Sequence, residues 1–159
     1  MQRTAFGEME CSIARTLDIA GEPWSPLIVR DVYVGINRFD DLQRDLGISR
    51  KVLTQRLNWL VQRGMLERRQ YSTRPPRSEY ALTTMGLEFC DILLMMTKWG
   101  DRWAPGPDGP PVLHRHQQCG HITHIHLSCD RCGQRVGAAD ITVEPGPGAP
   151  SSPGSQRSG

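Results

Sequence analysis

Apolar residues recur at helical spacing along the first part of the chain, and turn-forming residues separate the runs into short helices. A first helix is predicted to end before Gly21, a second to run from Trp24 to Val34, and a third to end at Gly47. A fourth helix begins only a few residues later. Two short helices joined by a glycine-containing turn form a helix-turn-helix, which is the motif this pattern predicts.

The fourth helix is predicted over residues 50–63 and has two different faces. Ser49 suits the N-cap because its hydroxyl can accept from the first turn, and Gly64 suits a left-handed C′ position. The apolar residues fall within roughly one third of the circumference and should face a core: Leu53, Leu57, Leu60 and Val61. The opposite side carries no acid, only Lys51, Thr54, Gln55, Asn58 and Gln62.

The next segment predicts a β-hairpin and then a long helix. Residues 67–71 and 78–82 are strand-like, whereas two adjacent prolines should exclude the segment between them from the strands. This gives a wing with a long basic tip that carries Arg74 and Arg77.

A final long helix is predicted from Met85 to about Trp103, with Thr83 or Thr84 as its cap. It is apolar around nearly its whole circumference. Such a helix is usually covered twice, by its own core and by a partner. Cys90 lies inside it and is expected in the core.

Composition changes after this helix. Residues 104–111 form a linker rich in Pro and Gly, and residues 146–159 are low in complexity and expected to be disordered. The patterns predict a mainly α fold with a small β-hairpin (α+β), a winged helix-turn-helix over residues 8–103. A small C-terminal zinc-ribbon-like segment is predicted over residues 112–145.

Charge is distributed unevenly although the chain carries a net charge of only +2. Residues 50–77 hold eight Lys and Arg against one acid, Glu67, whereas the segments on either side of this block are net acidic. Basic charge concentrated in one block is typical of a surface that binds a phosphate backbone.

Two pairs of metal-ligand residues lie in the tail, His116-x2-Cys119 and Cys129-x2-Cys132, each followed by glycine. Each pair resembles a zinc knuckle, and together they offer three thiolates and one imidazole, a closed tetrahedral zinc site. So short a segment has too little core to fold without metal. Residues 121–127 would form the hairpin between the knuckles. Two alternatives stay open: thiols without metal, or a different histidine from among His114, His121, His124 and His126.

No apolar run is long enough to span a bilayer and no signal peptide is recognisable, so a cytoplasmic location without membrane contact is expected. The odd number of cysteines favours thiols or metal ligands over a disulfide framework. Cys11 stands at the head of the first helix, where a helix N-terminus favours thiolate. Cys11 is therefore either a reactive thiol or simply a small buried apolar residue.

Five successive blocks resemble the HxlR family of bacterial winged helix-turn-helix regulators, which are MarR-like: "CSIARTLDIAGEPW", "PLIVRDVYVGINRFDDL", "ISRKVLTQRLNWLVQRGMLERR", "PPRSEYALTTMG" and "KWGDRW". The resemblance covers about residues 8–103. One departure is visible, because the family usually has Gly-Lys-Trp where this chain has Gly21-Glu22-Pro23-Trp24.

The resemblance implies a transcriptional regulator that binds double-stranded DNA as a homodimer, with its DNA-facing helices about one duplex turn apart. Amides can pair with base edges in a major groove, whereas an acid would repel phosphate. The residues near enough to enter the groove are Ser49, Arg50, Lys51, Thr54, Gln55 and Asn58. Arg74 and Arg77 would reach flanking phosphate or a minor groove, and Arg68 and Arg69 either bind DNA or are only solvated.

A repressor that responds to a redox signal or to a ligand is the favoured function, and some members of the family use a cysteine such as Cys11 as a sensor. The alternatives are a metal- or thiol-sensing regulator that uses the Cys/His tail, a protein-interaction adaptor, and a dithiol redox enzyme. No thioredoxin-like pattern surrounds Cys129 and Cys132, and no catalytic set was found, so no enzymatic activity is expected. The operator and the small-molecule effector do not follow from the sequence.

Overall fold

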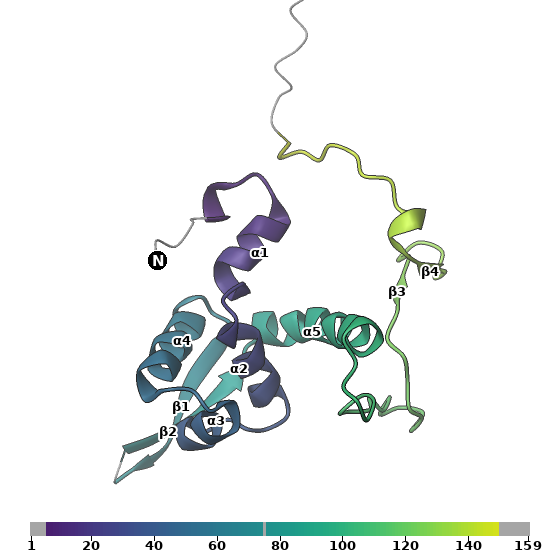
Figure 1. Ribbon diagram of the computed structural model, residues 1–159. Helices are drawn as coiled ribbons and strands as arrows, with labels where there is room; N and C mark the ends of the chain where they lie inside the picture. The colour runs from purple at the N-terminus through teal and green to yellow at the C-terminus, as the bar shows by residue number, and fades with distance from the viewer. Residues whose placement is uncertain (1–5, 75, 150–159) are drawn as a thin grey trace, which may run out of the picture. The chain divides into compact units, whose positions relative to one another are not determined.

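The computed structural model describes residues 6–74 and 76–149 (Figure 1). Its elements are η1 (Phe6–Glu8), α1 (Ser12–Ala20), α2 (Trp24–Tyr33), α3 (Phe39–Leu46), α4 (Arg50–Gln62), β1 (Leu66–Thr73), β2 (Pro76–Leu82), α5 (Thr84–Trp103), β3 (Leu127–Ser128), β4 (Arg135–Val136) and η2 (Ala138–Asp140).

Contacts divide the chain into two units. One unit is Ile19–His126, and the other joins Met1–Asp18 to Leu127–Gly159. The expected low-complexity end lies largely outside the described residues, and residues 146–149 form a turn closed by Ala149 N–H to Gly146 O at 3.0 Å.

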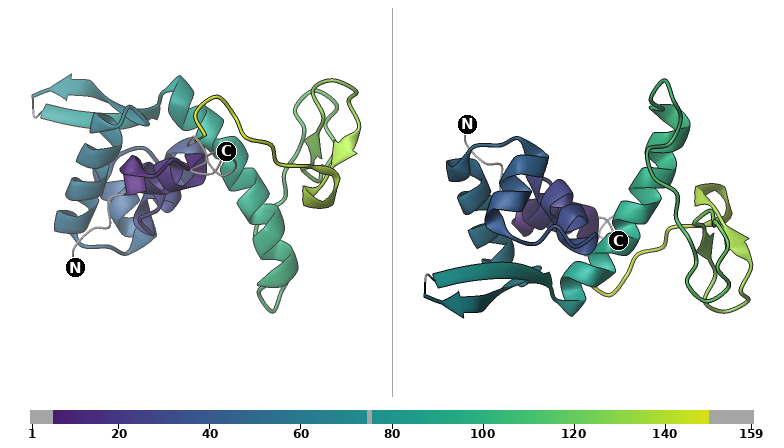
Figure 2. Two further views of the ribbon diagram at one scale, coloured as in Figure 1. Left: turned by 90° about the horizontal axis from the view of Figure 1, so that it is seen from above. Right: turned by 90° about the horizontal axis from the view of Figure 1, so that it is seen from below.

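The unit Ile19–His126 has a mainly helical core with one two-stranded antiparallel sheet, as predicted. Helices α2, α3 and α4 pack together, and the β1–β2 hairpin projects beyond them (Figures 1 and 2). The core is made of aliphatic side chains from all of these elements, among them Ile28, Val29, Leu42, Leu53, Leu57, Leu60, Met65 and Leu66. This arrangement is a winged helix-turn-helix.

Helix α4 begins and ends where its sequence predicts. The hydroxyl of Ser49 accepts from the Val52 N–H at 3.3 Å, and Gly64 follows the helix with a φ of +75°. Leu53, Leu57 and Leu60 are fully buried, so the face that carries the amides is turned to solvent.

The predicted long hairpin tip is wrong. Strand β1 continues to Thr73 and β2 begins at Pro76, with Ser72 opposite Arg77 across the sheet. Both strands of a two-stranded sheet are edge strands. A proline has no backbone N–H to donate, so it is tolerated as the first residue of an edge strand, where no ladder hydrogen bond depends on that N–H. A register shift between Gln70 and Ser72 accommodates the extension.

Asp31 is a fully buried carboxylate on α2, and its partner Arg30 also pairs with Asp45 on α3. Its Oδ1 accepts from Arg30 Nε and Nη2 at 2.8 and 2.5 Å, and Arg30 Nη2 also reaches Asp45 Oδ2 on α3 at 3.3 Å. Asp31 Oδ2 has no hydrogen-bond partner among the described residues. Burial raises the pKa of the Asp31 carboxyl above its usual 3.8, the Arg30 guanidinium opposes this, and the Asp45 charge adds to it.

We predict that Asp31→Asn gains stability relative to the parent as pH rises. Because the native pKa is raised, the unfolded carboxyl ionises first, and the parent loses stability between the unfolded pKa of 3.8 and the higher native pKa. The asparagine carries no such cost. The free energy of unfolding of both proteins, measured from about pH 4 to pH 8, checks this. A difference that stays constant over that range would contradict it.

Helix α5 starts in close contact with the turn after α4. Thr83 caps it, accepting from the Gly86 N–H at 3.1 Å, and the same hydroxyl donates to Gly64 O at 2.5 Å. A Cβ at Gly86 would lie 2.2 Å from the Met65 carbonyl oxygen. Only glycine therefore fits where α5 crosses this turn.

We predict that Gly86→Ala lowers the free energy of unfolding by about 1–3 kcal/mol or more, because the methyl group forces backbone apart in a packed core. Gly100→Ala is the matched control, since nothing lies within 4 Å of a Cβ there. That change should be neutral or stabilising by up to about 1 kcal/mol through helix propensity. Denaturant unfolding measures both, and equal stability of the two variants would contradict the close contact.

Candidate nucleic-acid interface

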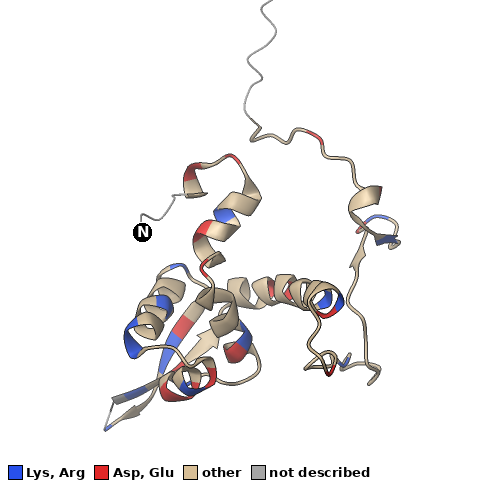
Figure 3. Cartoon of the chain, viewed as in Figure 1, with Lys and Arg blue, Asp and Glu red and all other residues tan. Residues whose placement is uncertain are grey.

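The solvent face of α4 is polar and lacks acids, as the sequence predicted. Its exposed residues from the cap onward are Ser49, Arg50, Lys51, Thr54, Gln55, Asn58 and Gln62. The Ser49 hydroxyl is already engaged as the N-cap. Figure 3 shows basic residues on α4 and on the hairpin beside it, whereas acids gather on α3.

Arg50 differs from the other exposed residues of α4 because its guanidinium contacts α3. Its Nη1 donates to Asp40 Oδ1 at 3.0 Å and to Gln43 Oε1 at 3.2 Å, and its Cζ lies 4.6 Å from the centroid of the Phe39 ring. These contacts hold the first turn of α4 against α3 and offset part of the charge. Arg50 is therefore better suited to positioning the helix than to contacting a base.

A groove of about 510 Å³ lies between α3, the first turn of α4 and the hairpin. Its guanidinium groups come from segments far apart in the chain: Arg38, Arg44, Arg50, Arg68 and Arg77. Two carboxylates, Asp40 and Asp41, lie on the α3 side, where they pair with Arg50 and Arg44 respectively.

Arg38 was not predicted as a site residue. Its Cζ lies 4.8 Å from the centroid of the Tyr71 ring, and its backbone forms a bridge to Glu79 of β2. Beside it, the Tyr80 N–H donates to Asn37 O at 2.8 Å. These contacts join the wing to the α2–α3 connection. No sequence pattern links residues more than thirty positions apart, so pairing of this kind becomes visible only in the fold.

The four wing arginines differ in their surroundings. Arg74 and Arg77 are exposed, whereas Arg69 pairs with Glu67 on its own strand. Arg68 lines the groove and lies opposite Tyr80 in the sheet. Burial raises the pKa of the Tyr80 hydroxyl, and the Arg68 charge lowers it in part. The sequence left open whether Arg68 and Arg69 bind DNA or are only solvated. Arg68 lines the groove, whereas the Glu67 carboxylate offsets the charge of Arg69.

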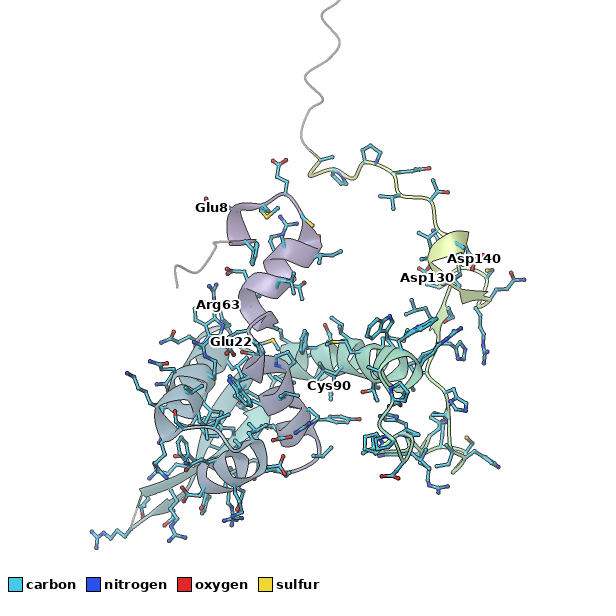
Figure 4. The ribbon with its side chains drawn as sticks, viewed as in Figure 1. Glu8, Glu22, Arg63, Cys90, Asp130 and Asp140 are labelled. Carbon is cyan, nitrogen blue, oxygen red and sulfur yellow. The ribbon has the colours of Figure 1, made fainter. Side chains whose placement is uncertain are left out.

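Helix α5 keeps one apolar row uncovered. Phe89 and Cys90 are buried, with Cys90 as predicted in the core (Figure 4). The exposed row has helical spacing and comprises Met85, Ile92, Met96, Trp99 and Trp103. At about 100° per residue these side chains share one side of the helix.

The beginning of the tail lies along a different side of α5. Leu94, Lys98 and Asp101 line a groove of about 270 Å³ together with Val112 and residues 122–125. At about 100° per residue, this row is roughly opposite the exposed apolar row. Residues 112–125 therefore leave that apolar row open.

The Cys/His pairs of the tail form two turns, one in each unit. In the first, His116 Nδ1 lies 3.3 Å from Cys119 Sγ. In the second, the backbone N–H groups of Cys132 and Arg131 and the Cys132 thiol lower the pKa of the Cys129 thiol. Figure 4 labels Asp130, which lies inside this turn. Among the described residues, no three His, Cys, Asp or Glu side chains gather into a group that could hold a metal ion, so zinc binding by the predicted set stays a prediction.

The expected hairpin over residues 121–127 is not observed as one continuous strand. Instead, each turn has its own flanking pair, Arg115 with Ile122 in the first and the short strands β3 and β4 in the second. The chain has two very short strand pairs in place of one hairpin, because each Cys/His turn brings together the residues on either side of it.

Cys11 is exposed immediately before α1, which argues against the alternative of a buried apolar residue. Its role as a sensor stays a prediction. Among the described residues, no helix is both long and apolar enough to cross a membrane.

The fold and the acid-free α4 face define a winged helix-turn-helix protein of the DNA-binding type. Residues 19–107 match the HxlR-like helix-turn-helix family, and the chain belongs to this family. Several relatives of the chain are named as HTH-type transcriptional regulators. The chain is 42% identical over 137 residues to Rv3095 of Mycobacterium tuberculosis, an uncharacterized HTH-type transcriptional regulator, covering 86% of this chain and 87% of the relative.

Solved structures agree with this assignment. The crystal structure of PA1607, a candidate transcription factor, is 30% identical with a TM-score of 0.77, and the match covers 89% of this chain and 99% of PA1607. The redox regulator HypR in its reduced form is 32% identical with a TM-score of 0.54, over 57% of this chain and 90% of HypR. The match to PA1607 thus extends beyond the winged helix into the tail.

Proposed function

We propose that the protein is a homodimeric, sequence-specific regulator of transcription that binds double-stranded DNA through α4 and the wing. The observation that carries this proposal is the exposed face of α4, which presents amides and a base without an acid, next to an arginine-lined groove. A duplex needs both features, since base edges are read by amides and the phosphate backbone is bound by cations.

The exposed residues divide between two kinds of contact. Gln55 and Asn58 suit adenine, whose N6 and N7 they can bind bidentately, and Lys51 suits guanine. Thr54 and the Ser49 backbone lie beside them at the start of the helix. On the wing, Arg74 and Arg77 suit flanking phosphate or a narrow minor groove.

The apolar row of α5 suits a second copy of the chain. A soluble monomer rarely exposes a contiguous row that includes two tryptophans, and neither its own core nor residues 112–125 cover it. A symmetric dimer would bury this row against itself and present two α4 helices to successive turns of the duplex.

Repression is the mode of action we favour, because a dimer seated in two major grooves excludes other proteins from the same DNA. An exposed Cys11 also suits a redox-responsive regulator, and HypR, a relative of known structure, is described as a redox regulator. Sensing through the Cys/His tail is the competing mode of regulation, and the location we expect is the cytoplasm.

We predict that Gln55→Ala and Asn58→Ala weaken binding to the operator by about 1–3 kcal/mol each, roughly five- to hundredfold, with little effect on unrelated duplexes. Gln62→Ala is the matched control, because Gln62 is exposed and is the last residue of α4, about three turns from the start of the helix. Arg77→Ala should weaken binding to every duplex and reduce the salt slope by about one. Fluorescence anisotropy on both kinds of DNA distinguishes these outcomes. Equal loss on all sequences for Gln55→Ala would exclude direct base recognition.

We predict that Met96→Glu converts the dimer to monomer, because it places an unpaired charge in a dry interface. Leu87→Glu is the matched control: Leu87 is 53% exposed and Met96 55%, but Leu87 lies on another side of α5. Sedimentation at micromolar concentration should show monomer only for Met96→Glu, and that variant should also lose operator binding. If Met96→Glu stays dimeric, the interface lies elsewhere, with α1 around Ile13 and Leu17 as the next candidate.

A further inference from the structure

The groove between the second half of α5 and the segment that follows it shares no residue with α4 or the wing. It has a volume of about 270 Å³, and every residue that lines it belongs to the unit Ile19–His126. Pockets for drug-sized ligands measure roughly 300–1,000 Å³. This groove therefore suits a molecule somewhat smaller than a drug.

The wall opposite α5 is held in shape by its own backbone. The Thr123 N–H donates to His114 O at 2.8 Å. Next to this bond, Arg115 and Ile122 form an antiparallel bridge. The wall is therefore formed before any ligand arrives, which lowers the entropic cost of binding.

The apolar part of the lining is aliphatic. It comprises Leu94 of α5 and, from the segment after it, Pro110, Val112, Leu113, Ile122 and Ile125. Val112 is 53% exposed and Ile122 43%, so both have apolar surface that a ligand could cover. Among the described residues, no Phe, Tyr or Trp lines the groove. An aliphatic group matches this surface better than an aromatic ring that would stack.

The charged part of the lining comes from α5 and carries both signs. Lys98, Asp101 and Arg102 are three and four residues apart, a spacing that places them on one face of the helix. Within the part of the chain that the structure describes, neither Lys98 nor Asp101 forms an ion pair. Two basic groups and one carboxylate therefore line the groove without neutralising one another, and His114 and His124 add ring nitrogens.

This distribution of charge discriminates between kinds of ligand. A simple carboxylic acid would meet the bases but also the Asp101 carboxylate, which repels it. A simple amine would be repelled by Lys98 and Arg102. A zwitterion can place its carboxylate at the bases and its ammonium at Asp101, so that both of its charges form charge-assisted hydrogen bonds. Charges of both signs next to an aliphatic surface are the complement of an aliphatic amino acid.

We propose that this groove binds a free α-amino acid with a branched aliphatic side chain. The ligand carboxylate accepts from Lys98 and Arg102, its ammonium donates to Asp101, and its side chain packs against the aliphatic lining. The site goes beyond DNA binding and does not depend on it, because the groove shares no residue with the arginine-lined groove beside α4.

The test is a titration of the full-length protein with L-leucine, followed through its two-dimensional amide NMR spectrum. We expect shifts in residues 94–102 and 112–125 and a dissociation constant on the order of 1 mM or lower. Three analogues each lack one part of the ligand: 4-methylpentanoate the ammonium, 3-methylbutylamine the carboxylate, and glycine the side chain. Each should bind at least about tenfold more weakly. Equal affinity for 4-methylpentanoate, or shifts confined to α4 and the wing, would overturn the proposal.

Two variants separate the charges of the ligand. Asp101→Asn should weaken binding of L-leucine by about ten- to hundredfold but leave 4-methylpentanoate unaffected or bound more tightly. Lys98→Met should weaken binding of both. Asp91→Asn is the matched control, because Asp91 is exposed on α5 and does not line the groove. If Asp101→Asn binds L-leucine as well as Asp91→Asn does, the assignment of the ammonium site is wrong and the proposal fails.

Discussion

The burial of three leucines on one side of α4 is the constraint on which the rest of the interface depends. Leu53, Leu57 and Leu60 have no exposed surface, and each contributes roughly 1.5–3 kcal/mol when buried. Because residues on a helix have fixed angular positions, this burial also decides which side chains point away from the core. Lys51 and Gln55 are outward because the leucines are inward. Stability and the proposed DNA recognition therefore rest on the same helix, through opposite faces.

Much of this could be predicted from local sequence. The limits of α4 follow from a serine cap and a glycine stop, and the two faces of α4 follow from periodicity alone. For α5 the sequence offered Thr83 or Thr84 as the cap, and the structure has Thr83. The sequence underestimated the length of the hairpin strands, because a proline that would break a central strand is tolerated at the start of an edge strand. Family resemblance added the class of protein, which neither charge nor periodicity could supply.

What the sequence could not predict depends on contacts between distant segments. Arg50 has a base-contacting position on the helical wheel, yet Asp40 and Gln43 of α3 hold its guanidinium. Arg38 joins the groove because the chain brings Tyr71 beside it. In the tail, spacing already paired His116 with Cys119, and the structure adds that its ring Nδ1 lies 3.3 Å from the Cys119 sulfur.

The central claim is that a dimer reads two half-sites with paired α4 helices, and hydroxyl-radical footprinting tests it most directly. The DNA should be the intergenic segment next to the gene that encodes this protein, searched for an inverted repeat. We expect two protected segments on one face of the duplex, separated by about one helical turn of roughly 10 base pairs, with weaker protection where the wings lie. A single protected segment, or uniform protection without a repeat, would contradict it.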